Sequence, residues 1–358
     1  MKENDPYTLS YENRKKLGTL LLLNPPKKMQ FGIDLSQWVI GEKFLGIKLI
    51  PFGIHYISFS LSNESMGFKQ GFFINITQKN RNIIREWSEK YETFFPLSEE
   101  LTKNYSIGLD NLDFDLNLGN YPHKQSSNWN DISSLINIDI INNLQKNINM
   151  SLTTDINNDE ENNEKLLLFS DINYTEINLN QPCLINSIDK SEILEKIFAN
   201  VKNNNINIVL GEFQYCFILF LIGESYEALK QWKDLFILIS SSEKIINKFE
   251  NFFCKFIEVI YEQLRILPDD LFHDVILENN FLKRYLSNFL LYEIKNCNKF
   301  NKRQELLKKF VEEKFGYKIL TEEERIIENY LKGIKSYDNN DDINDDLPVV
   351  VDEKDLNF

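Results

Sequence analysis

Histidine and cysteine, the side chains that most often hold metals or act as nucleophiles, are sparse in this sequence. The three histidines are His55, His123 and His273, and the four cysteines are Cys183, Cys216, Cys254 and Cys297. No two cysteines have the close spacing of a zinc-ligand pair, and no His-Glu-x-x-His pattern is present. We therefore predict reduced core thiols of an intracellular protein, a structural role for His55, and no metal site.

Asp34, in the stretch Phe-Gly-Ile-Asp, has a setting that suggests acid–base chemistry. An aspartyl dyad needs a second carboxylate in a matching setting, and none is recognisable. An aspartate at a turn more commonly accepts hydrogen bonds from backbone N–H groups, which predicts a structural role. Residues 223–227 (GESYE) lack the final glycine of a nucleophile elbow, and phosphate-binding glycine loops are absent. The sequence therefore predicts no enzyme activity and no cofactor.

The charge balance argues against direct contact with nucleic acid or a membrane. The chain has 54 acidic and 40 basic side chains, a net charge of −14, and a surface that negative repels phosphate. Its longest apolar run, 216–222, is far too short to span a bilayer. The basic cluster late in the chain is typical of a solvated helix face, although phosphate binding is an alternative. Its members are Lys299, Lys302, Arg303, Lys308 and Lys309.

The first part of the chain is β-rich. Residues 19–23, 54–61 and 71–77 are short apolar or alternating runs separated by glycine-containing turns, which is typical of strands. Residues 82–91 fit a strand or a short helix, and 98–105 a short helix. This pattern predicts an antiparallel sandwich or barrel-like N-terminal domain over residues 1–137.

The rest of the chain divides into a linker, a helical domain and a tail. Asn, Asp, Ser and Glu dominate residues 138–186, which predicts a flexible linker with a possible docked strand at 166–169. Residues 187–335 predict an all-α domain of about seven or eight helices, in which 206–222 is apolar all round and must be central. Residues 336–358 form an acidic tail predicted to be disordered before a strand-forming run at its end.

One block is specific in its details. Residues 31–60 carry F-G-I-D, then a Trp four residues after the Asp, then G-x-K-F-x-G-x-K-x-I-P-x-G-I-H. The further blocks, in order, are 71–73, 210–214, 221–223, 226–228, 232–233, 268–269, 280–282 and 348–351. Together they resemble the AAR-two family, the A-one-cistron splicing factors. The resemblance covers residues 31–90, 205–290 and the tail, and it is weak or absent over about 100–190.

The resemblance implies a β-rich domain followed by a VHS-like helical domain, without enzyme activity. It implies an assembly factor of the U-five small nuclear ribonucleoprotein (snRNP), in the cytoplasm and the nucleus. Such a factor binds the spliceosomal scaffold protein Prp-eight through its RNase H-like and Jab-MPN domains and delays docking of an RNA helicase. An acidic surface is suited to masking a basic partner. The alternative is a VHS-type peptide-binding trafficking adaptor, which leaves residues 31–55 unexplained.

The tail supplies the candidate partner-binding site. Its residues are Pro348, Val349, Val350 and Val351. Three consecutive valines after an acidic spacer have high strand propensity and no evident core to join. We expect this segment to add itself as a strand to a sheet of the partner, with packing onto the chain's own β-domain as the alternative.

Overall fold

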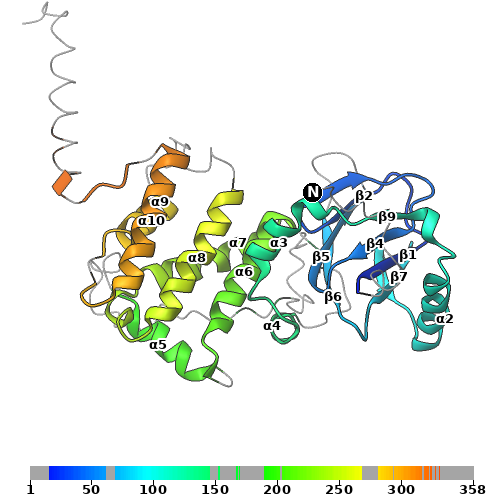
Figure 1. Ribbon diagram of the computed structural model, residues 1–358, viewed down its shortest axis with the longest axis horizontal. Coiled ribbons are helices and arrows are strands. Elements are labelled where there is room, and N and C mark those ends of the chain that lie inside the picture. Colours follow the sequence, from blue (N-terminus) through cyan, green and yellow to red (C-terminus); the bar gives the residue numbers. More distant parts are fainter. Residues whose placement is uncertain are drawn as a thin grey trace, which may run out of the picture.

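The computed structural model describes residues 16–61, 69–145, 152–153, 167, 169, 189–201, 204–267, 281–292, 294–316 and 318–321, with single positions at 323, 324, 327 and 330. A β-sandwich and a group of helices lie side by side along the long axis, with α3 and α6 between them (Figure 1). This arrangement confirms the expected α+β class. No helix in the described ranges is long and apolar enough to cross a membrane.

The sandwich consists of two five-stranded sheets that share an aromatic core. One sheet has the order β8-β7-β1-β4-β9, and the other β10-β6-β5-β2-β3. The rings of Phe59 and Phe94, from opposite sheets, lie 5.0 Å apart between centroids. The first sheet comprises β1 (Gly18–Leu23), β4 (Gly46–Ile50), β7 (Asn82–Ser88), β8 (Thr93–Pro96) and β9 (Leu118–Asn120). The second comprises β2 (Gln30–Ile33), β3 (Ser36–Val39), β5 (Gly53–Ser60), β6 (Gln70–Ile76) and β10 (Leu152–Thr153).

The antiparallel prediction holds for one sheet only. Every pairing in the β10-to-β3 sheet is antiparallel, but β1 pairs with β7 and β4 with β9 in parallel. Parallel neighbours need long connections. Alternation within a strand carries no information about the direction of its neighbour, so the sequence could not reveal these two pairs.

The helical part is built around α6, as its all-apolar sequence predicts. Helix α6 is covered on all sides, and α7 follows it directly after the break at Gly223. The helices are α2 (Glu99–Asp110), α3 (Ser126–Ser133), α4 (Ile138–Leu144), α5 (Ser191–Asn200), α6 (Asn207–Leu221), α7 (Tyr226–Ser240), α8 (Glu250–Ile266), α9 (Phe281–Phe289) and α10 (Asn298–Phe315). Residues 268–280 and most of 322–335, which belong to the expected helical domain, lie outside the described residues.

The start of the expected linker is not a linker. Residues 138–144 form α4, whose Ile140, Ile141 and Leu144 are buried against the helical core. Leu152 and Thr153 add a short strand to β6, and Leu167 forms a bridge with Gln145. The prediction of a flexible linker from residue 138 is therefore wrong for α4, because three large apolar side chains outweigh the Asn-rich composition around them. Most of residues 146–186 lies outside the described ranges.

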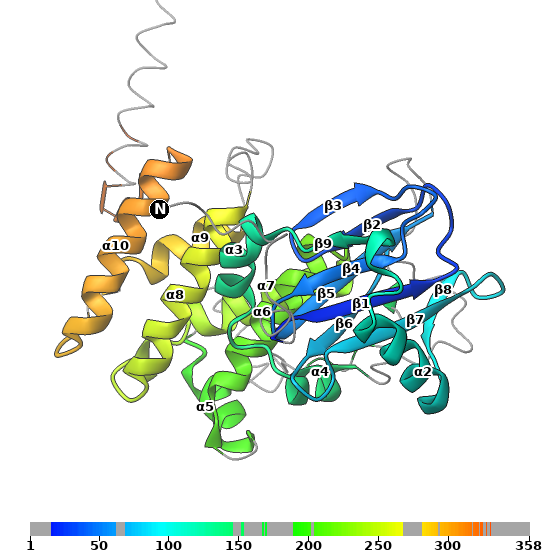
Figure 2. The same cartoon turned by 45° about the vertical axis from the view of Figure 1, so that its right-hand side comes forward.

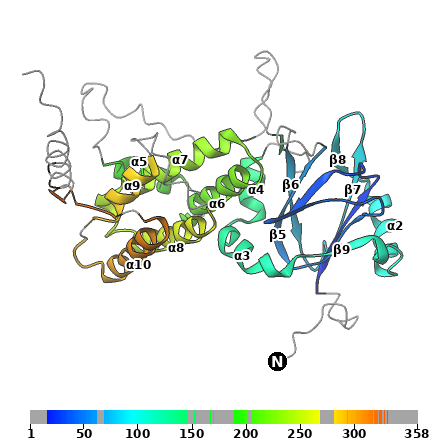
Figure 3. The ribbon, with the colours of Figure 1, turned by 90° about the horizontal axis from the view of Figure 1, so that it is seen from above.

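Gly211 lets α6 approach this segment closely. A Cβ atom on Gly211 would lie 2.8 Å from the carbonyl oxygen of Leu135 and 2.2 Å from a methyl group of Ile140. Both distances are far below van der Waals contact. The glycine therefore allows the α3–α4 connection to rest directly on the central helix (Figure 3). As a result, the chain that leaves the sandwich becomes part of the helical core.

Candidate functional site

Asp34 lies at the centre of a buried hydrogen-bond network in the face of the sandwich that meets the helices. Its Oδ2 atom accepts from Nδ1 of His55 and from the hydroxyl of Tyr121, both at 2.7 Å. Its Oδ1 atom accepts from the backbone N–H of Tyr56 at 3.0 Å. The expectation that Asp34 has a structural role agrees with this geometry, but its partners come from β5 and the loop after β9 rather than from its own turn.

The backbone at Asp34 suits an aspartate. Asp34 and Leu35 form the two-residue connection between β2 and β3, and Asp34 has a φ of 55°. Aspartate tolerates this left-handed conformation better than most residues because its short polar side chain can form local hydrogen bonds. The Asp34 N–H also donates to the carbonyl oxygen of Tyr56 at 2.8 Å. Backbone and side chain together tie the β2–β3 turn to β5.

His55 has no ring nitrogen left for substrate chemistry. The ring is 2% exposed, and its Nε2 atom hydrogen-bonds to the carbonyl oxygen of Pro51 at 2.9 Å. The indole of Trp129 on α3 lies parallel to the imidazole, with ring centroids 6.4 Å apart. Trp129 also donates from Nε1 to the carbonyl oxygen of Ile54 at 2.8 Å. The predicted structural role of His55 agrees with these contacts.

Tyr121 completes the network and serves as a neutral donor. Burial and the neighbouring Asp34 carboxylate raise the pKa of Tyr121 far above its usual range. A proton held this firmly keeps the hydroxyl as a hydrogen-bond donor to the carboxylate. The arrangement therefore stabilises one geometry of β2, β5 and the chain leading into α3, rather than moving protons.

Polar side chains fasten α3 to the helical core. Gln214 of α6 is fully buried and accepts from the N–H of Leu135 at 2.8 Å through Oε1. Its Nε2 atom donates to the carbonyl oxygen of Asp131 at 3.4 Å. One side chain therefore satisfies both a backbone donor and a backbone acceptor near the end of α3. At the surface, Arg265 of α8 pairs with the Asp131 carboxylate at 2.8 Å.

Aromatic rings continue this junction on the sheet itself. Phe73 of β6 stacks on Tyr215 of α6, with centroids 5.1 Å apart, and Tyr56 lies beside Phe73 at 4.8 Å. All three side chains belong to the same buried cluster as the helices. Lys69 donates to the exposed Glu224 carboxylate at 3.1 Å across the same boundary. The sandwich and the helices therefore share one apolar core, and we call this contact the domain junction.

The other candidate residues are dispersed. Cys216, Cys254 and Cys297 are free and buried, and no metal-binding group of three or more His, Cys, Asp or Glu occurs in the described ranges. Arg303 of the basic cluster pairs with Glu258, and Lys299 donates to Asn251 at 3.4 Å. Cys183, His273 and the tail segment Pro348, Val349, Val350 and Val351 lie outside the described residues.

Sequence reasoning missed Tyr121, Trp129 and Gln214. Tyr121 lies 87 residues from Asp34, and Gln214 lies 79 residues from Leu135, so no local spacing connects them. The one available signal was Gln214 itself, an amide within an apolar helix. Such a side chain needs buried hydrogen-bond partners.

Comparisons with known proteins agree with this architecture. Residues 16–146 match the family model described as the AAR2 N-terminal domain, and residues 184–320 match the AAR2 C-terminal repeat region. Together, these two matches span the junction, the helices α2 to α10, and every strand of the sandwich except β10.

Individual relatives give the same result. The mouse and human proteins named protein AAR2 homolog are each 28% identical to this chain over 315 residues. The alignments cover 76% of this chain and 81% of each relative. The corresponding protein of Caenorhabditis elegans is 25% identical over 308 residues, which cover 75% of this chain and 84% of the relative. The chain belongs to the AAR2 family, the AAR-two family that its motifs resemble, and is thus a splicing-related factor.

Proposed function

We propose that this protein is a non-enzymatic assembly factor of the U-five snRNP that binds a Prp-eight-like scaffold protein. In this proposal it contacts the RNase H-like and Jab-MPN domains of the scaffold and delays docking of the helicase. The observation that carries the proposal is the family match over both domains, together with relatives that align over 76% of this chain. Both ring nitrogens of His55 are engaged in hydrogen bonds, to Asp34 and to Pro51. This supports a structural rather than a catalytic role for His55 and Asp34.

The acidic surface supports a protein partner. A net charge of −14 favours association with a basic protein surface and disfavours direct RNA binding. We further propose that the factor acts in the cytoplasm and the nucleus, because assembly of such a particle would begin before its use in splicing.

The direct test is binding of the purified full chain to a purified scaffold fragment that contains the RNase H-like and Jab-MPN domains. Saturable binding at micromolar or lower concentration, lost when both scaffold domains are omitted, would support the proposal. Capture of endosomal sorting peptides in place of the scaffold fragment would instead favour the VHS-type adaptor. Binding to neither would contradict the assembly role.

The tail segment is the proposed strand-forming contact. Three or four inter-chain backbone hydrogen bonds, at about 1 kcal/mol each, would be offset in part by the loss of chain entropy on ordering. Deleting 347–358 is therefore expected to weaken scaffold binding by about ten- to a hundredfold and to leave the melting temperature nearly unchanged. Val350→Pro would reproduce much of this loss if its N–H pairs with the partner. Unchanged affinity after deletion would exclude this role for the tail.

A further inference from the structure

β3 is an edge strand of the sandwich. It is the last strand in its sheet order, and in the described part of the chain it pairs only with β2. Figure 2 shows it at the margin of the sheet, beyond β2. One long side of β3 therefore has backbone groups without a neighbouring strand among the described residues.

The register identifies which backbone groups point outward. The N–H of Ile40 donates to the carbonyl oxygen of Met29 at 3.0 Å, and Trp38 is paired with Phe31. Residues alternate in direction along an antiparallel strand, so Ser36, Trp38 and Ile40 bond to β2. The N–H and C=O groups of Gln37 and Val39 consequently face away from the sheet, which gives two donors and two acceptors. Val39 as a whole residue is also 52% exposed.

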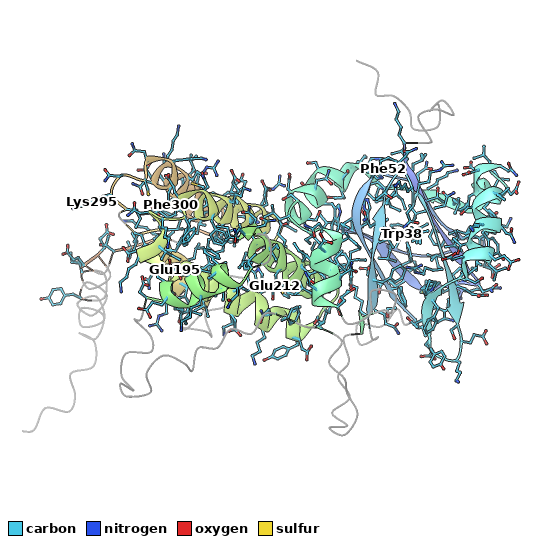
Figure 4. All side chains as sticks on the ribbon, turned by 90° about the horizontal axis from the view of Figure 1, so that it is seen from below. Trp38, Phe52, Glu195, Glu212, Lys295 and Phe300 are labelled. Carbon is cyan, nitrogen blue, oxygen red and sulfur yellow. The ribbon has the colours of Figure 1, made fainter. Side chains whose placement is uncertain are left out.

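Apart from its short length of four residues, this edge lacks the usual protections against strand addition. Exposed edge strands commonly carry lysine, proline or a bulge. By contrast, Ser36–Val39 contains no charged residue and no proline, and it pairs with β2 without a register shift. The edge is also rigid, because the ring centroid of Trp38 lies 5.7 Å from that of Phe31 and 6.4 Å from that of Phe44. Figure 4 labels Trp38 in the sandwich. A rigid edge loses little conformational entropy when a further strand binds.

Lysines surround one end of β3. Lys27 and Lys28 precede β2, Lys43 follows β3, and all three side chains are exposed. Glu42 lies next to Lys43 in the sequence, and its carboxylate pairs with Lys27 at 3.6 Å. The positive charges of Lys28 and Lys43 therefore exceed the negative charge at this end of the strand. In a chain with a net charge of −14, such an excess favours an acidic ligand at this position.

We propose that β3 is a second docking site, at which an extended acidic segment of a partner protein adds to the sheet. The peptide backbone of the segment pairs with Gln37 and Val39, and its acidic residues lie beside Lys28 and Lys43. This site is distinct from the tail contact of the proposed function and does not depend on it.

The probe is an eight-residue peptide, Asp-Asp-Thr-Val-Thr-Val-Asp-Asp, compared with a version in which every Asp is replaced by Asn. Fluorescein-labelled peptides are titrated with the full chain, and hydrogen exchange reports the amides of Gln37 and Val39. We expect slower exchange at both amides and about three- to tenfold tighter binding of the acidic peptide, a preference that salt removes. Lys28→Gln combined with Lys43→Gln should remove this preference without changing the neutral peptide.

Val39→Pro tests the edge itself. Its N–H points away from β2, so proline removes an outward donor and leaves the β2–β3 pairing intact. We expect about five- to tenfold weaker peptide binding at an unchanged melting temperature, with Val39→Thr as the matched control that retains binding.

Equal binding of the two peptides, or full binding by Val39→Pro, would overturn the proposal. A third outcome concerns the chain's own acidic, valine-containing tail. If Gln37 and Val39 are protected in the full chain without peptide, and truncation after residue 346 removes that protection, the edge belongs to the tail and the partner site is refuted.

Discussion

Replacing Asp34 tests whether the buried network holds the sandwich in its native geometry. In Asp34→Ala, three donors lose their acceptor: Nδ1 of His55, the hydroxyl of Tyr121 and the backbone N–H of Tyr56. Each buried donor left unsatisfied costs about 1–3 kcal/mol, and partial relaxation reduces the sum to about 3–5 kcal/mol. The left-handed backbone adds about 1 kcal/mol for alanine.

Asp34→Asn provides a matched control, because it keeps the shape and tolerates the same backbone conformation. If the asparagine oxygen accepts from Tyr56, its amide can donate to Nδ1 of His55 and to the oxygen of Tyr121. His55 then keeps its hydrogen bond from Nε2 to Pro51. The network is rewired rather than broken, so the loss should be about 1–2 kcal/mol, mainly from weaker charge-assisted bonds.

The measurements are urea unfolding and thermal unfolding, both monitored by far-ultraviolet circular dichroism. We expect the free energy of unfolding to fall in the order wild type, Asp34→Asn, Asp34→Ala. At about 2–4 °C per kcal/mol, a total loss of about 4–6 kcal/mol in Asp34→Ala should lower the melting temperature by about 8–24 °C. An Asp34→Ala protein within about 1 kcal/mol of wild type, or two variants with equal losses, would refute the reasoning from unsatisfied donors.

Three further predictions follow from the same structure. Trp232 is buried, stacks on Phe213 with ring centroids 5.7 Å apart, and donates from Nε1 to Oε1 of Gln263 at 3.0 Å. Trp232→Ala should therefore lower the free energy of unfolding by about 3–5 kcal/mol. Lost scaffold binding at an unchanged unfolding midpoint would instead make Trp232 an interface residue. Limited proteolysis should cut first after α4, in the Asn-rich stretch between about 140 and 186. The two fragments should co-elute in gel filtration because the junction is apolar. First cuts inside 205–290 or separate elution would contradict this. Fluorescence anisotropy should detect little RNA binding at physiological salt, whereas micromolar or tighter binding would count against a purely protein-binding role.

The elements that the sequence predicted well are those whose burial is visible locally. Helix α6 has no polar face, and such a helix can only be central. The partly alternating run at 54–61 identified β5 as a strand, but the structure buries both of its faces, one in the sandwich and the other against the helices. In both cases the type of element could be recognised from residues that are neighbours along the chain.

The parts that failed depend on contacts between distant residues. α4 was assigned to a linker because Asn, Asp, Ser and Glu dominate residues 138–186 as a whole. The burial of its Ile and Leu side chains depends on the close approach of α6 at Gly211, which the local sequence does not reveal. Asp34 and His55 were recognised singly, but their hydrogen bond required the register of β2 against β5. Sequence spacing indicates which face of a strand is buried but not which strand pairs with it. Hydrogen-bond networks that join different strands therefore could not be predicted from the sequence.

The domain junction determines how two domains of this kind can meet a partner. Domains joined by a flexible linker bind as two tethered modules, and the second contact depends on the effective concentration set by the linker. Here Phe73, Tyr215 and Trp129 place the sandwich and the helices in one continuous core. A partner that contacts both therefore meets one preformed surface and loses less entropy on binding. The buried hydrogen bonds of Asp34 and Gln214 lie where they help to fix the orientation of the sandwich relative to the helices, which under the proposed function would present one preformed surface to the scaffold.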